Sequence, residues 1–293
     1  MNSLKTTKGE IPFPAYIPVT TYGSKYPLDK LIQPYLPRLA PAVMVSHYYA
    51  QEMKIKPRIP LMIDSGGFAL LFEGNHVQEQ NGLGCLVINK EEKTELLTPW
   101  DVLDFQEKYA DVAFTLDFPI PPKTEIKEAR LRQKMTIANA IWALENRRKK
   151  KMLLFAVIQG WDLESISYCA KQYQDKTFDG VALGGMVPRA RNREFVLDCV
   201  KTVRVILPNL PLHIFGMGNP DSLPELYLAG VSSTDSSSYV KAAADGQSWP
   251  HGKKTPCILN TDRLKLAIQN LAYVNYIVLP NLINSTSLSN SSR

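Results

Sequence analysis

The chain has 293 residues, of which 45% are hydrophobic and 21% charged, and its formal net charge at pH 7 is +6. No apolar run approaches the roughly 20 residues of a membrane span, and the N-terminal segment MNSLKTTKGEIPFP lacks the apolar core of a signal peptide. These features exclude a membrane-spanning protein and favour a globular cytoplasmic one. The modest positive charge permits a polyanionic partner without requiring one.

Eight short apolar segments are predicted as buried strands, and helical segments separate most of them. The predicted strands cover residues 14–20, 42–45, 61–63, 112–116, 153–158, 180–183, 212–215 and 230–234. The predicted helices cover residues 28–37, 98–109, 124–149, 162–174 and 192–206, and a shorter one begins near Asp221. This α/β alternation predicts right-handed βαβ units closed into a single-domain (β/α)8 TIM barrel over residues 1–283. A doubly wound open sheet is the alternative.

The remaining segments carry weaker signals. Residues 73–98 are polar, contain glycine and show no clear period, so we expect an excursion from the barrel or a loop there. Residues 258–279 predict a final helix and a strand-like run that cover the barrel wall. The tail over residues 284–293 is low in complexity and is predicted to be disordered.

Four cysteines, Cys85, Cys169, Cys199 and Cys257, lie far apart in the sequence. None belongs to a C-x-C or C-x-x-C pair, so the chain shows neither a zinc signature nor a disulfide framework. We therefore expect reduced thiols, no metal site and no cofactor.

Polar residues or glycines follow most of the predicted strands. They are Asp64, Asp117, Gln159, Gly184, Gly185, the Gly216-Met217-Gly218 run and Asp235. In a closed barrel these positions converge on one mouth, where they suit a hydrogen-bonding heterocycle. Two carboxylates in one site can also divide glycosidic chemistry between a nucleophile and an acid/base. Taken alone, Asp64 is equally compatible with a residue that caps the following turn.

Seven motifs together resemble the tRNA-guanine transglycosylase superfamily. They are PAYIPVTTYG, IDSGGF, TLDF, FAVIQG, GVALGGM, IFGMGNPDSL and AGVSSTD, in the family's order and within about residues 12–240. The resemblance implies that Asp235 is the nucleophile that attacks the sugar C1′ and expels guanine, and that Asp64 is the acid/base. It also implies a base pocket in which Asp117, Gln159, Gly184 and Gly185 read the purine edge and Phe68 and Phe215 sandwich the ring. Ser65, Met186 and Gly216 complete the predicted substrate-binding set.

Two departures from the family pattern bear on the substrate. The family's zinc-binding cysteines and histidine should follow the nucleophile by several tens of residues, but only Cys257 is found there, so we expect a barrel without the zinc-binding subdomain. The acid that closes the family's GGLxxGE motif is replaced by Ala190, which disfavours a cationic aminomethyl base. Both features resemble the DNA-guanine transglycosylases of phages and genomic islands.

The sequence therefore predicts exchange of guanine in DNA for a free 7-deazaguanine base, with 7-cyano-7-deazaguanine favoured, in the host cytoplasm if a phage encodes the chain. The alternatives are tRNA exchange without the zinc module, a non-catalytic accessory subunit and an unrelated barrel hydrolase. In a duplex target, the guanine would have to be flipped out or the strands melted.

The predicted phosphate contacts are Arg189, Arg191, Arg193, Lys253 and Lys254. A second basic run, residues 147–151, is predicted to close the helix over residues 124–149, and we prefer to interpret it as solvated surface.

Overall fold

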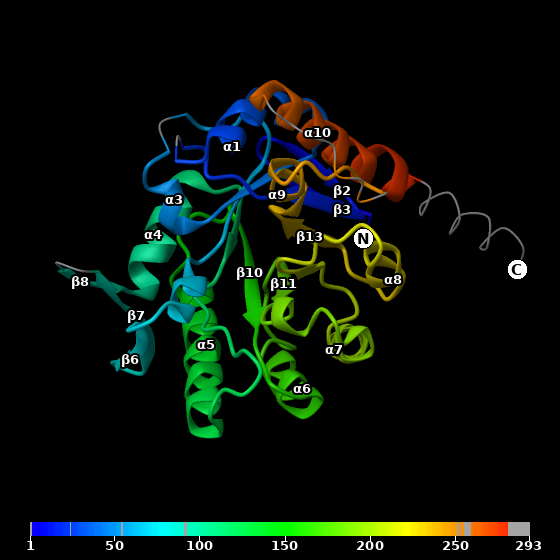
Figure 1. Ribbon diagram of the computed structural model, residues 1–293. Helices are drawn as coiled ribbons and strands as arrows, with labels where there is room; N and C mark the ends of the chain where they lie inside the picture. The colour runs from blue at the N-terminus through cyan, green and yellow to red at the C-terminus, as the bar shows by residue number, and fades with distance from the viewer. Residues whose placement is uncertain are drawn as a thin grey trace, which may run out of the picture.

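A computed structural model describes residues 2–23, 25–53, 55–90, 93–250, 252, 254 and 259–280. Its central sheet has eight strands in the order β3-β13-β12-β11-β10-β9-β5-β4, and neighbouring strands in this order are parallel. The two ends of this order meet through a parallel bridge between Val19 and Met44. The strands are β3 (Ala15–Pro18), β4 (Val43–Val45), β5 (Leu61–Ile63), β9 (Val112–Phe114), β10 (Leu153–Ile158), β11 (Gly180–Leu183), β12 (Leu212–Ile214) and β13 (Ser233–Ser236). The predicted TIM barrel is confirmed (Figure 1).

Helices surround the strands, as Figure 1 shows. They are α1 (Pro27–Ile32), α2 (Leu36–Leu39), α3 (His47–Ala50), α4 (Pro99–Tyr109), α5 (Ile126–Asn146), α6 (Leu163–Lys171), α7 (Arg193–Ile206), α8 (Leu223–Leu228), α9 (Ser238–Ala244) and α10 (Asn260–Tyr273), with short η1 (Gln33–Tyr35), η2 (Gly67–Leu71), η3 (Val187–Arg189) and η4 (Val274–Val278) turns. The start of α4 illustrates why they form where they do. Thr98 accepts a hydrogen bond from the Asp101 backbone N–H, and Asp101 accepts one from the Thr98 N–H, which satisfies two donors at the helix end.

An apolar cluster fills the barrel interior toward its amino-terminal end, where a hairpin that was not predicted from the sequence closes it. The hairpin pairs β1 (Ser3–Thr6) with β2 (Gly9–Pro12), and its Leu4 and Ile11 join the interior cluster of the strands. Buried Asp111 anchors it, because its carboxylate accepts from the Thr7 hydroxyl at 2.7 Å and lies 3.0 Å from the Lys8 ammonium.

Residues 73–98 form an excursion from the barrel with regular structure, so the loop alternative is wrong. This segment folds into a three-stranded antiparallel sheet of β6 (His76–Gln80), β7 (Leu83–Lys90) and β8 (Lys93–Leu97), which lies beside α4 and α5 in Figure 1. Buried Asn139 of α5 joins it to the barrel, since its amide accepts from Gly84 N–H at 2.9 Å and donates to the oxygens of Gly84 and Leu116 at 2.9 and 3.2 Å. Gly84 permits the close approach, because a Cβ there would lie 2.4 Å from Phe118.

Three other expectations need correction. The strand predicted over 230–234 begins later, as β13 (Ser233–Ser236), so Asp235 lies within the strand and not after it. The chain turns at Gly230, which has a φ of 105°, before the strand begins. The strand-like run near the end is wrong, because η4 continues α10 as helix. Helix α5 ends at Asn146 and has no basic residue in its last turn, so residues 147–151 follow the helix. The predicted tail lies outside the described residues.

We expect Asn139→Ala to lower the free energy of unfolding by about 2–4 kcal/mol, because it leaves buried backbone groups of Gly84 and Leu116 without partners. Urea denaturation would measure the loss. Asn146→Ala is the matched control, since this asparagine is exposed on the same helix and makes one hydrogen bond, to Trp142 O. Equal losses in the two variants would contradict a structural role for Asn139.

Candidate active site

The carboxylate of Asp235 is held inside the barrel by the neighbouring strand. Residues His213 and Ser233 are paired in the register of β12 and β13, so His213 and Asp235 face the same side. Asp235 Oδ1 lies 3.0 Å from His213 Nε2 and accepts from the Gly216 N–H at 2.9 Å. On the other side of the ring, His213 Nδ1 lies 2.9 Å from the Ser233 hydroxyl, so the imidazole bridges Ser233 and Asp235.

His213 had no role in the sequence prediction. It is fully buried, and its ring contacts Phe114 and Phe215. The sequence contained a signal for a role of His213. It stands two positions before Phe215, so both side chains lie on the same face of the strand, and a histidine that faces an apolar interior needs a hydrogen-bond partner. Finding that partner required the strand register.

The Asp64 carboxylate lies beyond the end of β5 and is partly buried. Its Oδ1 accepts from the backbone N–H of Gly66 at 2.8 Å and of His47 at 3.2 Å. Loss of solvation, reinforced by the negative charge of Asp235, raises the pKa of Asp64 to about 6 against these hydrogen bonds. The two predicted catalytic carboxylates are thus close enough to interact, and one of them is suited to exchange a proton near neutral pH.

Asp117 and Gln159 form a second polar group. One oxygen of Asp117 accepts from the Ser65 hydroxyl and the other from Gln159 Nε2, both at 2.7 Å. Burial raises the pKa of Asp117, and these hydrogen bonds oppose the rise. Gln159 Oε1 is buried and accepts no hydrogen bond within the described residues, so it is available to a ligand N–H. Gly184 makes room for this side chain, because a Cβ there would lie 2.2 Å from Gln159 Nε2.

The other predicted base-binding residues are distributed around these groups. Phe215 is partly buried against Phe114, whereas Phe68 is 64% exposed and packs edge-on against Phe72. The two predicted sandwich rings each pack against another phenylalanine, so their sandwich stays a prediction. Met186 is fully buried. Gly185 and Gly216 both have a φ of 71°, and their turns direct the backbone at the ends of β11 and β12.

The predicted phosphate contacts differ in exposure. Arg189 is buried and donates to the oxygens of Ile120 and Gly185 at 2.9 and 2.6 Å, so its guanidinium is engaged inside the protein and we remove it from the set. Arg191 and Arg193 are exposed, although Arg193 lies 3.7 Å from Glu225. Lys254 is exposed, and Lys253 lies outside the described residues.

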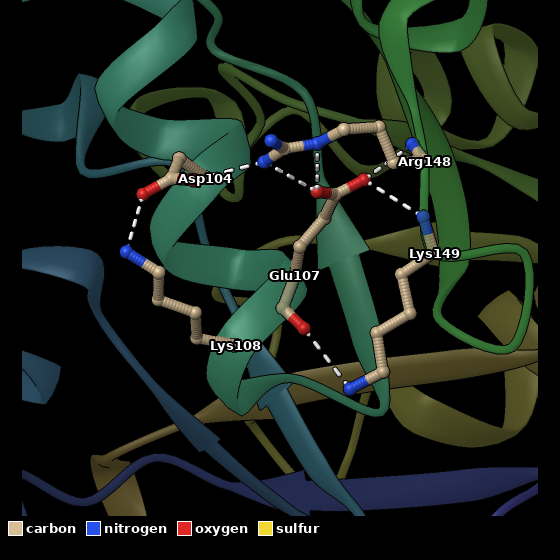
Figure 2. A network of polar contacts seen from close by, with 5 residues as sticks. All are labelled: Asp104, Glu107, Lys108, Arg148 and Lys149. Atoms are coloured by element: carbon tan, nitrogen blue, oxygen red, sulfur yellow. Dashed lines mark hydrogen bonds and ion pairs between the residues drawn. The ribbon is translucent and has the colours of Figure 1, made fainter.

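Part of the second basic run is neutralised by acids on α4 (Figure 2). Arg148 pairs with the carboxylates of Asp104 and Glu107 at 2.9 Å. The Lys149 ammonium donates to the backbone carbonyl oxygen of Glu107 at 3.0 Å. Arg147 is buried against Asp179. These contacts tie the segment to the protein. Buried Arg147 corrects the interpretation of the whole run as solvated surface, while residues 148–151 are exposed.

Among the described residues, no group of three His, Cys, Asp or Glu side chains could hold a metal ion. Cys85, Cys169 and Cys199 are buried and free, while Cys257 lies outside the described part. The expected absence of a metal therefore stays a prediction.

Comparison with known proteins decides the family. A family model described as queuine tRNA-ribosyltransferase matches residues 1–274. The chain belongs to this family. Similar members include a tRNA-guanine(15) transglycosylase from Methanococcus aeolicus, 32% identical over 51% of this chain and 24% of the relative. Another from Methanosarcina mazei is 28% identical over 64% and 35%. A queuine tRNA-ribosyltransferase from Thermosipho africanus is 26% identical over 64% and 52%.

The matches thus span from about a quarter to about half of the length of these queuine tRNA-ribosyltransferase family members. In the part of the chain that the structure describes, no helix is long and apolar enough to cross a membrane.

We expect Asp64→Asn to stabilise this family member at pH 7 by on the order of 1–2 kcal/mol, after allowance for its partial exposure. The pKa of Asp64 is about 6 in the folded protein against an ordinary value of 3.8. Between these values the folded protein binds more protons than the unfolded chain, so the carboxylate costs stability as pH rises, and the cost is complete above about pH 6.

The asparagine keeps an oxygen for the two backbone donors and carries no charge. Urea denaturation at pH 7 and at pH 4 would measure the gain, most of which should vanish at the lower pH. Asp245→Asn, at an exposed position, is the control and should change little. A gain of the same size at both pH values would argue against a charge effect at Asp64.

Proposed function

We propose that this chain exchanges guanine in a polynucleotide for a free 7-deazaguanine base through a glycosyl ester on Asp235. The observation that carries the proposal is the pair of interacting carboxylates in one barrel mouth. Asp235 is oriented by His213 and the Gly216 N–H, and Asp64 has a pKa raised to about 6. Glycosyl transfer with a covalent intermediate needs these two roles, a fixed nucleophile and a group that can give and take a proton.

The proposed reaction proceeds in two displacements. An oxygen of Asp235 attacks the sugar C1′, the bond from C1′ to the base breaks, and Asp64 gives its proton to the leaving guanine. The incoming base then loses a proton to Asp64 as its nitrogen attacks C1′, which releases the Asp235 carboxylate. Each half-reaction restores the charge that the other removes, so no further reactant is required.

The base would be read at Asp117, Gln159 and the backbone of Gly184 and Gly185. The free acceptor at Gln159 Oε1 supports this, because a purine edge offers N–H donors. Ser65 fixes the Asp117 carboxylate. Phe68 and Phe215 are the proposed ring contacts and Met186 lines the pocket, with Arg191, Arg193, Lys253 and Lys254 as proposed phosphate contacts.

tRNA and DNA are the two candidate polymers for this exchange. The relatives are named for tRNA, so tRNA is the better-supported target. The prediction of DNA rests on the missing cysteine cluster. The segment that follows the nucleophile by several tens of residues folds here as α10 and η4, which contain no cysteine.

Asp235→Asn should lower exchange on the order of a thousandfold or more, because an amide cannot form the glycosyl ester. Incorporation of a radiolabelled base would measure the rate, and denaturing electrophoresis would detect the protein–nucleic acid adduct. The exposed Asp245→Asn variant should retain both. An adduct formed at the wild-type level by Asp235→Asn would place the nucleophile elsewhere.

A competition of labelled bases and polymers would resolve the substrate. With tRNA and DNA offered together, we expect label in tRNA on the strength of the relatives; label confined to DNA would instead support the prediction made from the missing cysteines. With the 7-cyano and aminomethyl bases offered together, we expect the neutral cyano base, because Ala190 supplies no anion for an ammonium group. Preference for the aminomethyl base would show that another acid replaces the missing one.

A further inference from the structure

Three tyrosines and a lysine gather where the barrel closes. Tyr26 and Tyr49 stack edge-on with ring centroids 6.3 Å apart, and their hydroxyls lie 3.2 Å apart. The Tyr48 ring meets that of Tyr49 at 5.1 Å. The Lys25 ammonium lies 5.7 Å from the ring centroids of both Tyr26 and Tyr49. We call Tyr26, Tyr48 and Tyr49 the tyrosine platform.

The platform lies at the mouth that holds the two carboxylates. Tyr26 follows β3 and directly precedes α1, while Tyr48 and Tyr49 follow β4 within α3. The carboxyl ends of these strands are neighbours across the barrel closure. Tyr48 is one residue from His47, whose N–H donates to the Asp64 carboxylate. A polymer whose nucleotide enters the site would therefore pass beside the platform.

Hydrogen bonds anchor the described residues on both sides of Lys25 and Tyr26. The buried carboxylate of Asp29 accepts from the backbone N–H and the hydroxyl of Thr21, at 3.0 and 2.7 Å. The Gln33 amide reaches Gly23 O from the same helical region at 3.4 Å. This anchoring reduces the entropy that would be lost if a ligand had to order the loop.

The chemistry of the platform fits a nucleic-acid base better than an apolar protein surface. Tyr26 and Tyr48 are 47% and 46% exposed, and aromatic rings stack on any base because each base has a π-face. The hydrogen bond to Tyr26 raises the pKa of Tyr49 to about 12, so this phenol carries no charge at neutral pH. The Lys25 ammonium suits a phosphate, and the negative charge of Glu52 acts on the Tyr49 phenol of the same platform.

We propose that the tyrosine platform stacks a base next to the exchanged guanine while Lys25 contacts the adjoining phosphate. The inference rests on the proposed function, because it takes the ligand to be a single-stranded segment of the target polynucleotide. It adds a contact outside the base pocket, one that the two polymers share.

The test measures binding of short single-stranded DNA and RNA oligonucleotides that contain one guanine, by fluorescence anisotropy. Each is made intact and with abasic sites beside the guanine. Tyr26→Ala and Tyr48→Ala should weaken binding of the intact oligonucleotide by about 5- to 100-fold, and this loss should vanish with the abasic one. Tyr48→Phe should bind like the wild type. Lys25→Ala should reduce the slope of log Kd against log salt by about 0.7.

Tyr168→Ala and Lys171→Ala are matched controls on α6, at exposed positions, and should leave binding unchanged. The inference is overturned if the wild type binds intact and abasic oligonucleotides equally, or if the platform variants bind like the wild type. If the wild type still exchanges bases in that case, the proposed function stands. Wild-type protein that binds neither oligonucleotide would overturn the inference too. Platform-dependent binding without exchange would uphold it and reject the proposed reaction.

Discussion

The candidate site depends on the register of the closed parallel sheet. His213 of β12 stands opposite Ser233 of β13, and this pairing brings the imidazole to both the Ser233 hydroxyl and the Asp235 carboxylate. Side chains alternate between the faces of a strand, so a slip of one residue would turn Asp235 toward the helices. The neighbouring pairing of β13 with β3 fixes the same register from the other side, with Asp235 opposite Ile17.

Within that frame, the site holds two like charges near each other. The negative charge of Asp235 contributes to the raised pKa of Asp64, and backbone N–H groups of Gly66 and Gly216 moderate the repulsion, one for each carboxylate. Fixed backbone donors stabilise charge without the reorganisation that water requires. The arrangement costs folding stability and in return gives Asp64 a carboxyl group that can give and take a proton near neutral pH.

The sequence was sufficient to predict the barrel, because short buried strands ending in polar residues have a strong local signal. The convergence of Asp64, Asp117, Gln159 and Asp235 on one site stays a prediction, within which the structure joins Asp117 to Gln159. The sequence did not reveal the sheet of β6 to β8, whose largely exposed outer strands lack an apolar alternation and whose stability comes from contacts such as that of Asn139 with Gly84. It also misplaced Arg189, since the burial of a guanidinium against carbonyl oxygens depends on how a loop folds back. The partner of His213 was hidden for a related reason, as it lies 22 residues away.

The hairpin at the amino-terminal end of the barrel has a consequence for the fate of a covalent intermediate. Leu4 and Ile11 pack against the interior residues of the strands, and Asp111 anchors the hairpin through Thr7 and Lys8. A packed apolar floor keeps water from approaching along the barrel axis. If Asp235 carries a glycosyl ester, water and the incoming base can both reach it only from the mouth of the barrel. A base bound in the pocket there would then shield the ester from hydrolysis.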